Sequence, residues 1–456
     1  MIQSVIFGLV TIAAFAIAGK KFLQIRRNIL LGESEEITGD TGERWKNVLL
    51  VAFGQKKMFK NWIPAVFHFF IYAAFLLTQI ELIEILIDGF SGNHRFFAPV
   101  LGGFYTFLIN FIEILSVLAL VATIVFLSRR NLLKVPRFFK PEMKGWPFKD
   151  GNLILILELL LLIGIFSMNG ADVVLQSLNH PHYPDTGTLL VSSQLGPALF
   201  GGLDADSLIV IERFGWWLHI LVVFAFLNYL PYSKHLHIFF AFPNTYFAKI
   251  QPKGEMDNMD SIMNEVKSMM GFPDAPPSEM AEGGELPVFG SNDVTNLGWT
   301  NILAAYSCTE CGRCTAACPA NITGKKLSPR KIMMDVRDRA DEIGKKLDGG
   351  SKEFIKAEKK ESETILTAEN FDDGKSLFDY ITREEIHACT TCNACVEACP
   401  VLINPLDIIL KLRRYEILTE SAGPGEWLPL FNSIENGGSA WQIPDDRDKW
   451  AVDMES

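Results

Sequence analysis

The sequence predicts an all-α protein in two parts, a bundle of membrane-spanning helices followed by a helical domain that holds every cysteine. Three observations lead to this prediction. Five long apolar runs precede residue 231, two cysteine runs follow at 308–318 and 389–399, and no segment alternates between apolar and polar residues as a strand would. The expected divisions are a membrane domain at 1–243, a linker at 244–296, a cysteine domain at 297–420 and an acidic tail at 421–456.

The apolar runs have the length of membrane spans. They cover about residues 2–18, 61–87, 99–127, 152–168 and 208–230. Each is close to or above the roughly 20 residues that cross a bilayer as a helix. No basic residue precedes the first run and a basic cluster follows it, at Lys20, Lys21, Arg26 and Arg27. Because a signal peptide has the opposite polarity, we expect a retained span.

The charges between the runs predict the topology. The first and third connecting segments contain nine and seven lysines and arginines, whereas the second has only Arg95 and the fourth has none. By the positive-inside rule, the N-terminus lies outside the inner membrane and everything after about Pro231 lies in the cytoplasm. The formal net charge is −11 with no basic stripe, which gives no reason to expect a nucleic-acid partner.

The cysteines form two runs with the spacing C-x2-C-x2-C-x3-C-P, and together these use all eight cysteines of the chain. This spacing is typical of two [4Fe-4S] clusters, in which the fourth cysteine of each run ligates the other cluster. Zinc is the alternative, because four thiolates also complete a tetrahedral site. A reducing cytoplasm suits the clusters and leaves no expectation of disulfides. The expected ligand sets are Cys308, Cys311 and Cys314 with Cys399, and Cys389, Cys392 and Cys395 with Cys318.

Short helices are expected around the cysteine runs. Ser328 is a candidate N-cap for a helix over 329–343, and further helical segments are predicted over 376–381, 383–387 and 405–419. In the linker, 259–270 is amphipathic, and 274–287 is too rich in Pro, Gly and Glu to form a core.

Two histidines lie well inside the apolar runs, His68 in the second and His219 in the fifth. They could ligate a b-type haem between two helices, or each could hydrogen-bond a neighbouring helix, and both interpretations stay open. His237 follows His219 by five helical turns and shares its face if the helix is regular, with His235 facing the other way. Met58 is the candidate partner of His237 at a second haem. The alternative is that His235 and His237 are interfacial anchors.

Carboxylates in the spans are candidates for proton transfer. Quinone chemistry moves protons with electrons, so Glu81, Glu84 and Glu113 are candidate relays at a quinone site. Asp88 is expected at a solvated helix end. His94, His180 and His182 are expected at the surface.

The membrane half resembles the gamma subunit of respiratory nitrate reductase, a dihaem cytochrome b that exchanges electrons with quinol. Five spans, one histidine early in the second and two in the fifth, 18 residues apart, carry this resemblance. It implies a haem b at the outer side between His68 and His219, and a second haem at His237, where Met58 replaces the family's other histidine.

The cysteine half, about 294–418, resembles the C subunit of heterodisulfide reductase and the helical dicluster domain of succinate dehydrogenase iron–sulfur subunits. The segments LSPRKIMMDVR and PLDIILKLRR carry this resemblance.

Together these resemblances imply an oxidoreductase subunit in the lipid bilayer. It would pass electrons between the quinone pool, menaquinone or ubiquinone, and a cytoplasmic partner, either a flavoprotein or an iron–sulfur subunit with CCG domains. All cysteines are used, so a catalytic thiol would belong to that partner. Two alternatives are the membrane subunit of a heterodisulfide or sulfur-compound reductase, and a haem-free membrane-tethered ferredoxin.

Overall fold

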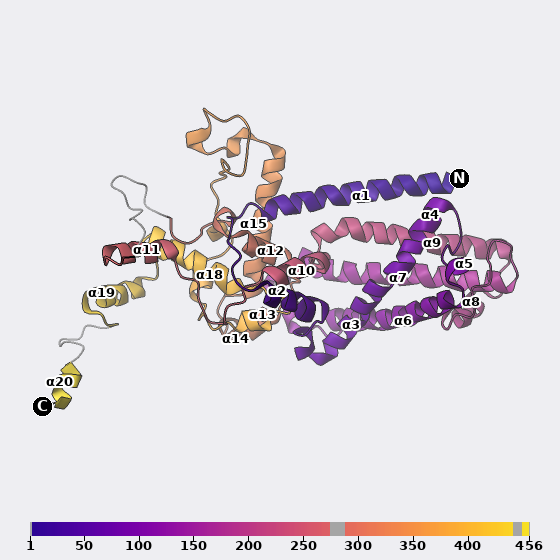
Figure 1. The fold of residues 1–456 in the computed structure, drawn as a ribbon, viewed down its shortest axis with the longest axis horizontal. Coiled ribbons are helices and arrows are strands. Elements are labelled where there is room, and N and C mark those ends of the chain that lie inside the picture. The colour runs from indigo at the N-terminus through magenta and orange to yellow at the C-terminus, as the bar shows by residue number, and fades with distance from the viewer. Residues whose placement is uncertain (1, 274–287, 441–448, 456) are drawn as a thin grey trace.

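The structure is a computed structural model that describes residues 2–273, 288–440 and 449–455. These residues are mostly helical and contain only two isolated β-bridges in place of strands, which confirms the predicted helical fold. Figure 1 shows the long helices side by side, with the cysteine domain at one end of the bundle.

Five helical segments are long and apolar enough to cross a membrane, which confirms the predicted number of spans. The chain is therefore a multi-pass membrane protein. The spans are α1 (Ile2–Ile29), α3 with α4 (Trp62–Leu77 and Gln79–Ser91), α6 (Gly103–Asn131), α7 (Trp146–Ser177) and α9 (Ala205–Tyr229). The shorter helices of this half are α2 (Thr41–Asn47), α5 (Ala98–Leu101), α8 (Ser192–Phe200) and α10 (His237–Phe247).

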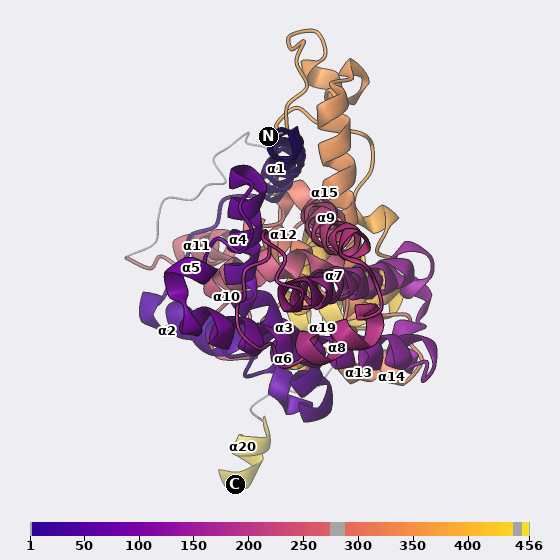
Figure 2. The ribbon, with the colours of Figure 1, turned by 90° about the vertical axis from the view of Figure 1, so that its right-hand side faces the viewer.

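Small residues set the packing of the bundle. A Cβ atom on Gly215 of α9 would lie 2.6 Å from the backbone nitrogen of Met168 in α7, so only glycine allows the two backbones to approach this closely. The second span bends at Thr78, and α4 leaves the line of α3 to pack beside α1 (Figures 1 and 2). Phe7 of α1 fills the space left by Gly89.

The fifth span ends differently from the sequence prediction. Its α-helix stops at Tyr229, a 3-10 turn covers Leu230–Tyr232, and Ser233 is extended before α10 begins at His237. Proline at 231 has no N–H group with which to continue the α-helix. The helix from His219 to His237 is therefore not regular. His235 and His237 do not point to opposite sides of one helix, and their ring centres lie 5.7 Å apart.

The cysteine domain is built from short helices and one long one. Its helices are α12 (Trp299–Tyr306), α13 (Arg313–Ala317), α14 (Pro319–Ile322), α15 (Pro329–Gly349), α16 (Arg383–His387), α17 (Ala394–Ala398) and α18 (Pro405–Arg414). Ser328 accepts a hydrogen bond from Lys331 N and caps α15, as predicted. The segment predicted over 376–381 is a single 3-10 turn, Leu377–Asp379. A π turn over Tyr415–Thr419 continues α18 to the predicted end.

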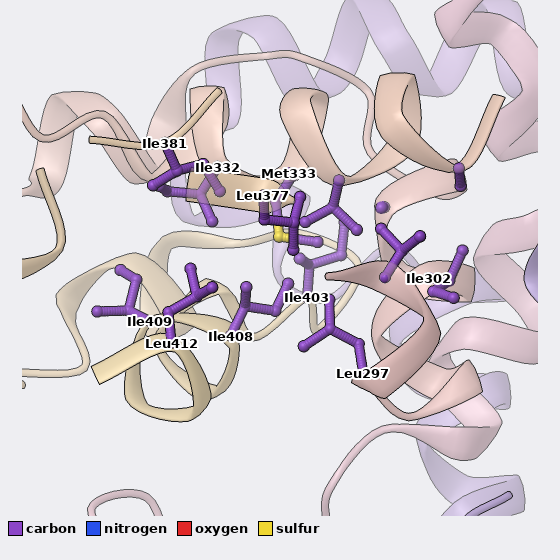
Figure 3. Close-up of a cluster of buried hydrophobic side chains, with 14 of the residues drawn as sticks. Leu297, Ile302, Ile332, Met333, Leu377, Ile381, Ile403, Ile408, Ile409 and Leu412 are labelled. Carbon is purple, nitrogen blue, oxygen red and sulfur yellow. The ribbon is translucent and has the colours of Figure 1, made fainter. Parts of the chain in front are cut away.

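One hydrophobic core joins the two halves of the molecule. In the cysteine domain it contains the fully buried Leu297, Ile332 and Ile408 (Figure 3). Ile25 and Ile29, at the end of the membrane helix α1, belong to the same cluster. The cysteine domain is therefore packed onto the bundle and is not simply tethered to it.

The linker and the tail contain further helices. The amphipathic segment forms α11 (Asp260–Met269), as predicted, whereas the Pro-, Gly- and Glu-rich stretch 274–287 lies outside the described residues. The tail includes α19 (Leu428–Gly437) and α20 (Lys449–Glu455). Trp427 stands edge-on against His387 at 4.8 Å, which anchors the start of α19 near the second cysteine run.

Candidate electron-transfer site

The two cysteine loops have the same backbone shape. Glu310 and Gly312 in the first loop, and Thr391 and Asn393 at the equivalent places in the second, have positive φ angles of 51°, 71°, 54° and 58°. Gly and Asn tolerate this conformation better than other residues. Turns of this kind point successive N–H groups into a concavity that favours an anion, such as a thiolate-bound iron–sulfur cluster.

The eight thiols gather around two cavities. The first is lined by Cys308, Cys311, Cys314 and Cys399. The second is lined by Cys389, Cys392, Cys395 and Cys318. The fourth cysteine of each run thus lines the cavity of the other run, as the expected ligand sets require.

The four thiols that line each cavity suit an iron–sulfur cluster, and zinc is the ion to compare with it. Four thiolates around zinc, at about 2.3 Å from the metal, would lie roughly 3.8 Å from one another. In the described parts of the chain, no three His, Cys, Asp or Glu side chains are close enough to share one metal ion. Four thiolates can instead hold the corners of a cubane.

Burial makes these thiols depend on bound iron. It raises the pKa of Cys308 to about 12 and that of Cys399 to about 11, although nearby backbone N–H groups lower both. At neutral pH such thiols ionise only when iron stabilises the thiolate.

Basic side chains connect the first cavity to the membrane domain. Arg330 of α15 is fully buried and lines this cavity. Its guanidinium donates to the Glu142 carboxylate at 2.7 Å and to the Arg137 carbonyl at 2.8 Å, both in the segment between the third and fourth spans. Lys234, which directly precedes His235, donates to the Glu310 carboxylate in the first cysteine loop at 2.7 Å. The first cavity therefore faces the bundle.

Arg313 is a residue that sequence reasoning missed. It lies between Cys311 and Cys314, lines the first cavity and is only 8% exposed. Its one hydrogen bond to a described residue is to the Lys57 carbonyl, at 3.5 Å. A buried cation with so weak a partner favours an anion beside it, and a cluster in the first cavity supplies one. Its position between two cysteines of the first run is the feature of the sequence that could have identified it.

The second cavity has one exposed thiol, although two others of its set, Cys318 and Cys395, are buried. Cys392 is exposed, whereas the four thiols around the first cavity are buried or partly buried.

The predicted haem ligands are distributed differently from the expectation. The rings of His68 and His237 lie 6.5 Å apart, whereas the expectation placed His219 opposite His68. The Nδ1 atom of His219 lies 3.1 Å from the carbonyl oxygen of Leu161 in α7. The other predicted ligand, Met58, lies in a single 3-10 turn, Met58–Lys60, ahead of α3.

The candidate relay carboxylates are all buried at the far end of the bundle. Glu84 accepts hydrogen bonds from Tyr105 OH at 2.7 Å and from Phe97 N at 2.8 Å. Glu113 accepts from the backbone N–H groups of Val191 and Ser192 and so caps α8. Glu81 differs from these two, because its Oε1 atom has no hydrogen-bond partner among the described residues.

Two expectations about this end of the bundle were wrong. Asp88 is not solvated but 9% exposed, because it accepts from the N–H groups of Arg95 and Phe96 as the chain turns back. His94 is not simply a surface residue. Its side chain is 18% exposed and lies 3.2 Å from the buried Asp172, which also pairs with Arg95 at 2.9 Å.

Comparison with known proteins identifies the cysteine region. Residues 307–403 match the sequence family described as the 4Fe-4S dicluster domain. No solved structure matches the chain.

Three relatives extend the comparison. The chain is 30% identical over 438 residues to the probable iron-sulfur-binding oxidoreductase FadF of Bacillus subtilis, covering 92% of this chain and 57% of that protein. It is 25% identical over 406 residues to the EtfAB:quinone oxidoreductase of Syntrophomonas wolfei, covering 86% and 51%. A probable membrane-anchored ferredoxin of Chromohalobacter salexigens is 32% identical over 176 residues, covering 36% and 24%.

The chain spans about half the length of the first two relatives. Both are named as oxidoreductases, one of them acting on quinone. The family match agrees with the paired cysteine loops and the two four-thiol cavities. The chain therefore carries a 4Fe-4S dicluster domain at residues 307–403, packed onto a multi-pass membrane domain.

Proposed function

We propose that this protein is the membrane subunit of a respiratory oxidoreductase. It passes electrons between a cytoplasmic redox partner and the quinone pool, through two [4Fe-4S] clusters and haem b. Each cluster accepts and releases one electron. Reduction of one quinone to quinol uses two electrons and two protons, so two single-electron carriers in series deliver the electrons one after the other.

The observation that carries this proposal is the position of the first cavity. Its cysteine loop contacts the membrane domain through Lys234 and Glu310, and Arg313 contacts the segment that leads into the second span. On the other side, the second cavity carries the exposed Cys392. An exposed thiol at the second cavity, and a first cavity that faces the bundle, suit a path from a soluble partner into the membrane.

The arrangement of the loops supports the predicted orientation. The segments rich in Lys and Arg lie at the same end as the cysteine domain, because Arg137 contacts Arg330 and Arg27 donates to the Gly344 carbonyl. With these segments on the inner side, the dicluster domain lies in the cytoplasm and the N-terminus outside. Relatives named as oxidoreductases, one with quinone in its name, support the substrate class.

A haem-free membrane-tethered ferredoxin is the second candidate, because one relative is named a probable membrane-anchored ferredoxin. It would carry electrons between soluble proteins and would not exchange them with quinone.

Quinone-dependent reoxidation distinguishes the two functions. The anaerobically purified full chain, in vesicles and reduced with a limiting amount of dithionite, is mixed with menaquinone or ubiquinone. We expect the reduced-cluster EPR signal to disappear with quinone and to persist without it. A signal that persists with both quinones, but disappears on adding an oxidised soluble ferredoxin, would contradict the quinone function and support the tether.

A further inference from the structure

We infer that the membrane domain holds its haem iron between His68 and His237, and that Gln55 positions His68 for this role. The inference rests on the proposed function, and it replaces the His68–His219 pairing that the resemblance implies. It places the haem at the end of the bundle that meets the first cysteine loop.

The separation of the two rings fits one iron between them. Two imidazoles that bind the same metal at about 2 Å each have ring centres roughly 6 to 6.5 Å apart. The centres of the His68 and His237 rings lie 6.5 Å apart. Both residues are partly buried.

Both histidines also offer the correct nitrogen. Nδ1 of His237 lies 2.9 Å from the Lys234 carbonyl oxygen, and Nδ1 of His68 lies 3.2 Å from Oε1 of Gln55. These oxygens can only accept, so each Nδ1 carries the proton and each Nε2 keeps its lone pair. Neither Nε2 has a hydrogen-bond partner among the residues that the structure describes. This is the tautomer that a metal-ligating histidine needs.

Gln55 is held in place at a conformational cost. It is 5% exposed and has a φ angle of 51°, which is unfavourable for a residue with a side chain. Its carbonyl accepts the N–H group of Met58, which fixes the turn that precedes α3. Strained residues of this kind persist where the surrounding structure requires them, and here the turn directs the amide oxygen at His68.

His219 has a different environment. It stands where α7 and α9 are closest, because a Cβ atom on Gly164 would lie 3.0 Å from its backbone nitrogen. Its Nδ1 faces the Leu161 carbonyl of the neighbouring helix, and among the described residues no second histidine ring stacks within range of it. This hydrogen bond leaves its Nε2 free, as in His237, so what distinguishes His219 is that no facing histidine ring lies near it among the described residues.

The experiment compares four histidine variants in the full-length membrane protein. Haem b is measured by the pyridine haemochromogen assay, and cluster absorbance monitors folding of the same samples. We expect His68→Gly and His237→Gly to lose at least nine-tenths of the haem, with added imidazole restoring a low-spin spectrum. His219→Gly, and the matched control His235→Gly two residues from His237, retain it.

The outcomes separate this inference from the proposed function. Wild-type protein without haem would overturn both the haem route and the inference. Loss of haem in His219→Gly, with retention in His237→Gly, would overturn the inference and leave the function intact.

Gln55 is tested by the haem potential. Gln55→Glu places a stronger acceptor on Nδ1, makes the imidazole more basic and should lower the midpoint potential. Gln55→Met, of similar size but with only a weak acceptor, should raise it, with the haem content kept in both. Unchanged potentials in both variants would show that Gln55 does not position His68.

Discussion

Replacing Cys399 with serine is expected to remove the cluster of the first cysteine run rather than that of its own. Cys399 follows Cys395 by four residues, yet it lines the cavity formed by Cys308, Cys311 and Cys314. The variant should lose about four of eight irons, because a cubane that lacks one thiolate is held poorly. The EPR spectrum of the reduced variant should match that of Cys308→Ser.

The reciprocal variant provides the control. Cys318 lines the second cavity, so Cys318→Ser should give the same spectrum as Cys389→Ser. A Cys399→Ser spectrum that matches Cys389→Ser would mean that each run binds its own cluster, and the crossed assignment would be wrong.

Replacing Arg339 with methionine is expected to destabilise the cysteine domain by about 3–5 kcal/mol. Arg339 is 1% exposed and forms ion pairs with Asp293 at 2.6 Å and Asp373 at 2.7 Å. These carboxylates lie before and after α15 in the sequence, so the arginine holds three segments together. Its loss leaves two largely buried carboxylates without their main partner, which costs more than the loss of the attraction alone.

Chemical denaturation of the detergent-solubilised protein, followed by cluster absorbance, measures this effect. Lys345→Met on the same helix is the matched control, because Lys345 is exposed and should change the midpoint little. Equal midpoints for the two variants would show that the buried ion pairs do not stabilise the domain.

The fold could be predicted from the sequence wherever a single property, such as the length of an apolar run or the spacing of cysteines, determines the local structure. Long apolar runs have few alternatives to membrane helices, and the spacing of Cys308, Cys311 and Cys314 leaves little choice of cofactor. The placement of Cys318 and Cys399 beside the thiols of the other run was predictable for the same reason. Ser328 was predictable as a cap because its hydroxyl has a backbone N–H group three residues ahead.

The position of His237 was not predictable from residue counting. Counting turns from His219 assumed a regular helix, but the break at Leu230–Tyr232 and the extended Ser233 move His237 beside His68. Asp88 looked exposed at a helix end because its partners are backbone N–H groups of the following turn. Contacts of this kind depend on tertiary structure and have no pattern in the sequence.

The same limit applies to Gln55 and Arg330. Gln55 belongs to no motif that was expected to touch the site, and Arg330 lies in the segment LSPRKIMMDVR, to which no contact with the site had been assigned. Gln55 reaches His68 through a turn with a positive φ angle, and Arg330 reaches Glu142 in another connecting segment. Residue type alone does not show which buried polar side chain will face a functional group.

The central claim is that the cysteine domain holds two neighbouring [4Fe-4S] clusters. EPR of anaerobically purified, fully reduced protein, with metal analysis of the same sample, tests this claim most directly. The crossed cavities predict about eight irons per chain and two magnetically interacting [4Fe-4S] signals. Zinc in place of iron, or a single isolated cluster signal, would contradict the claim.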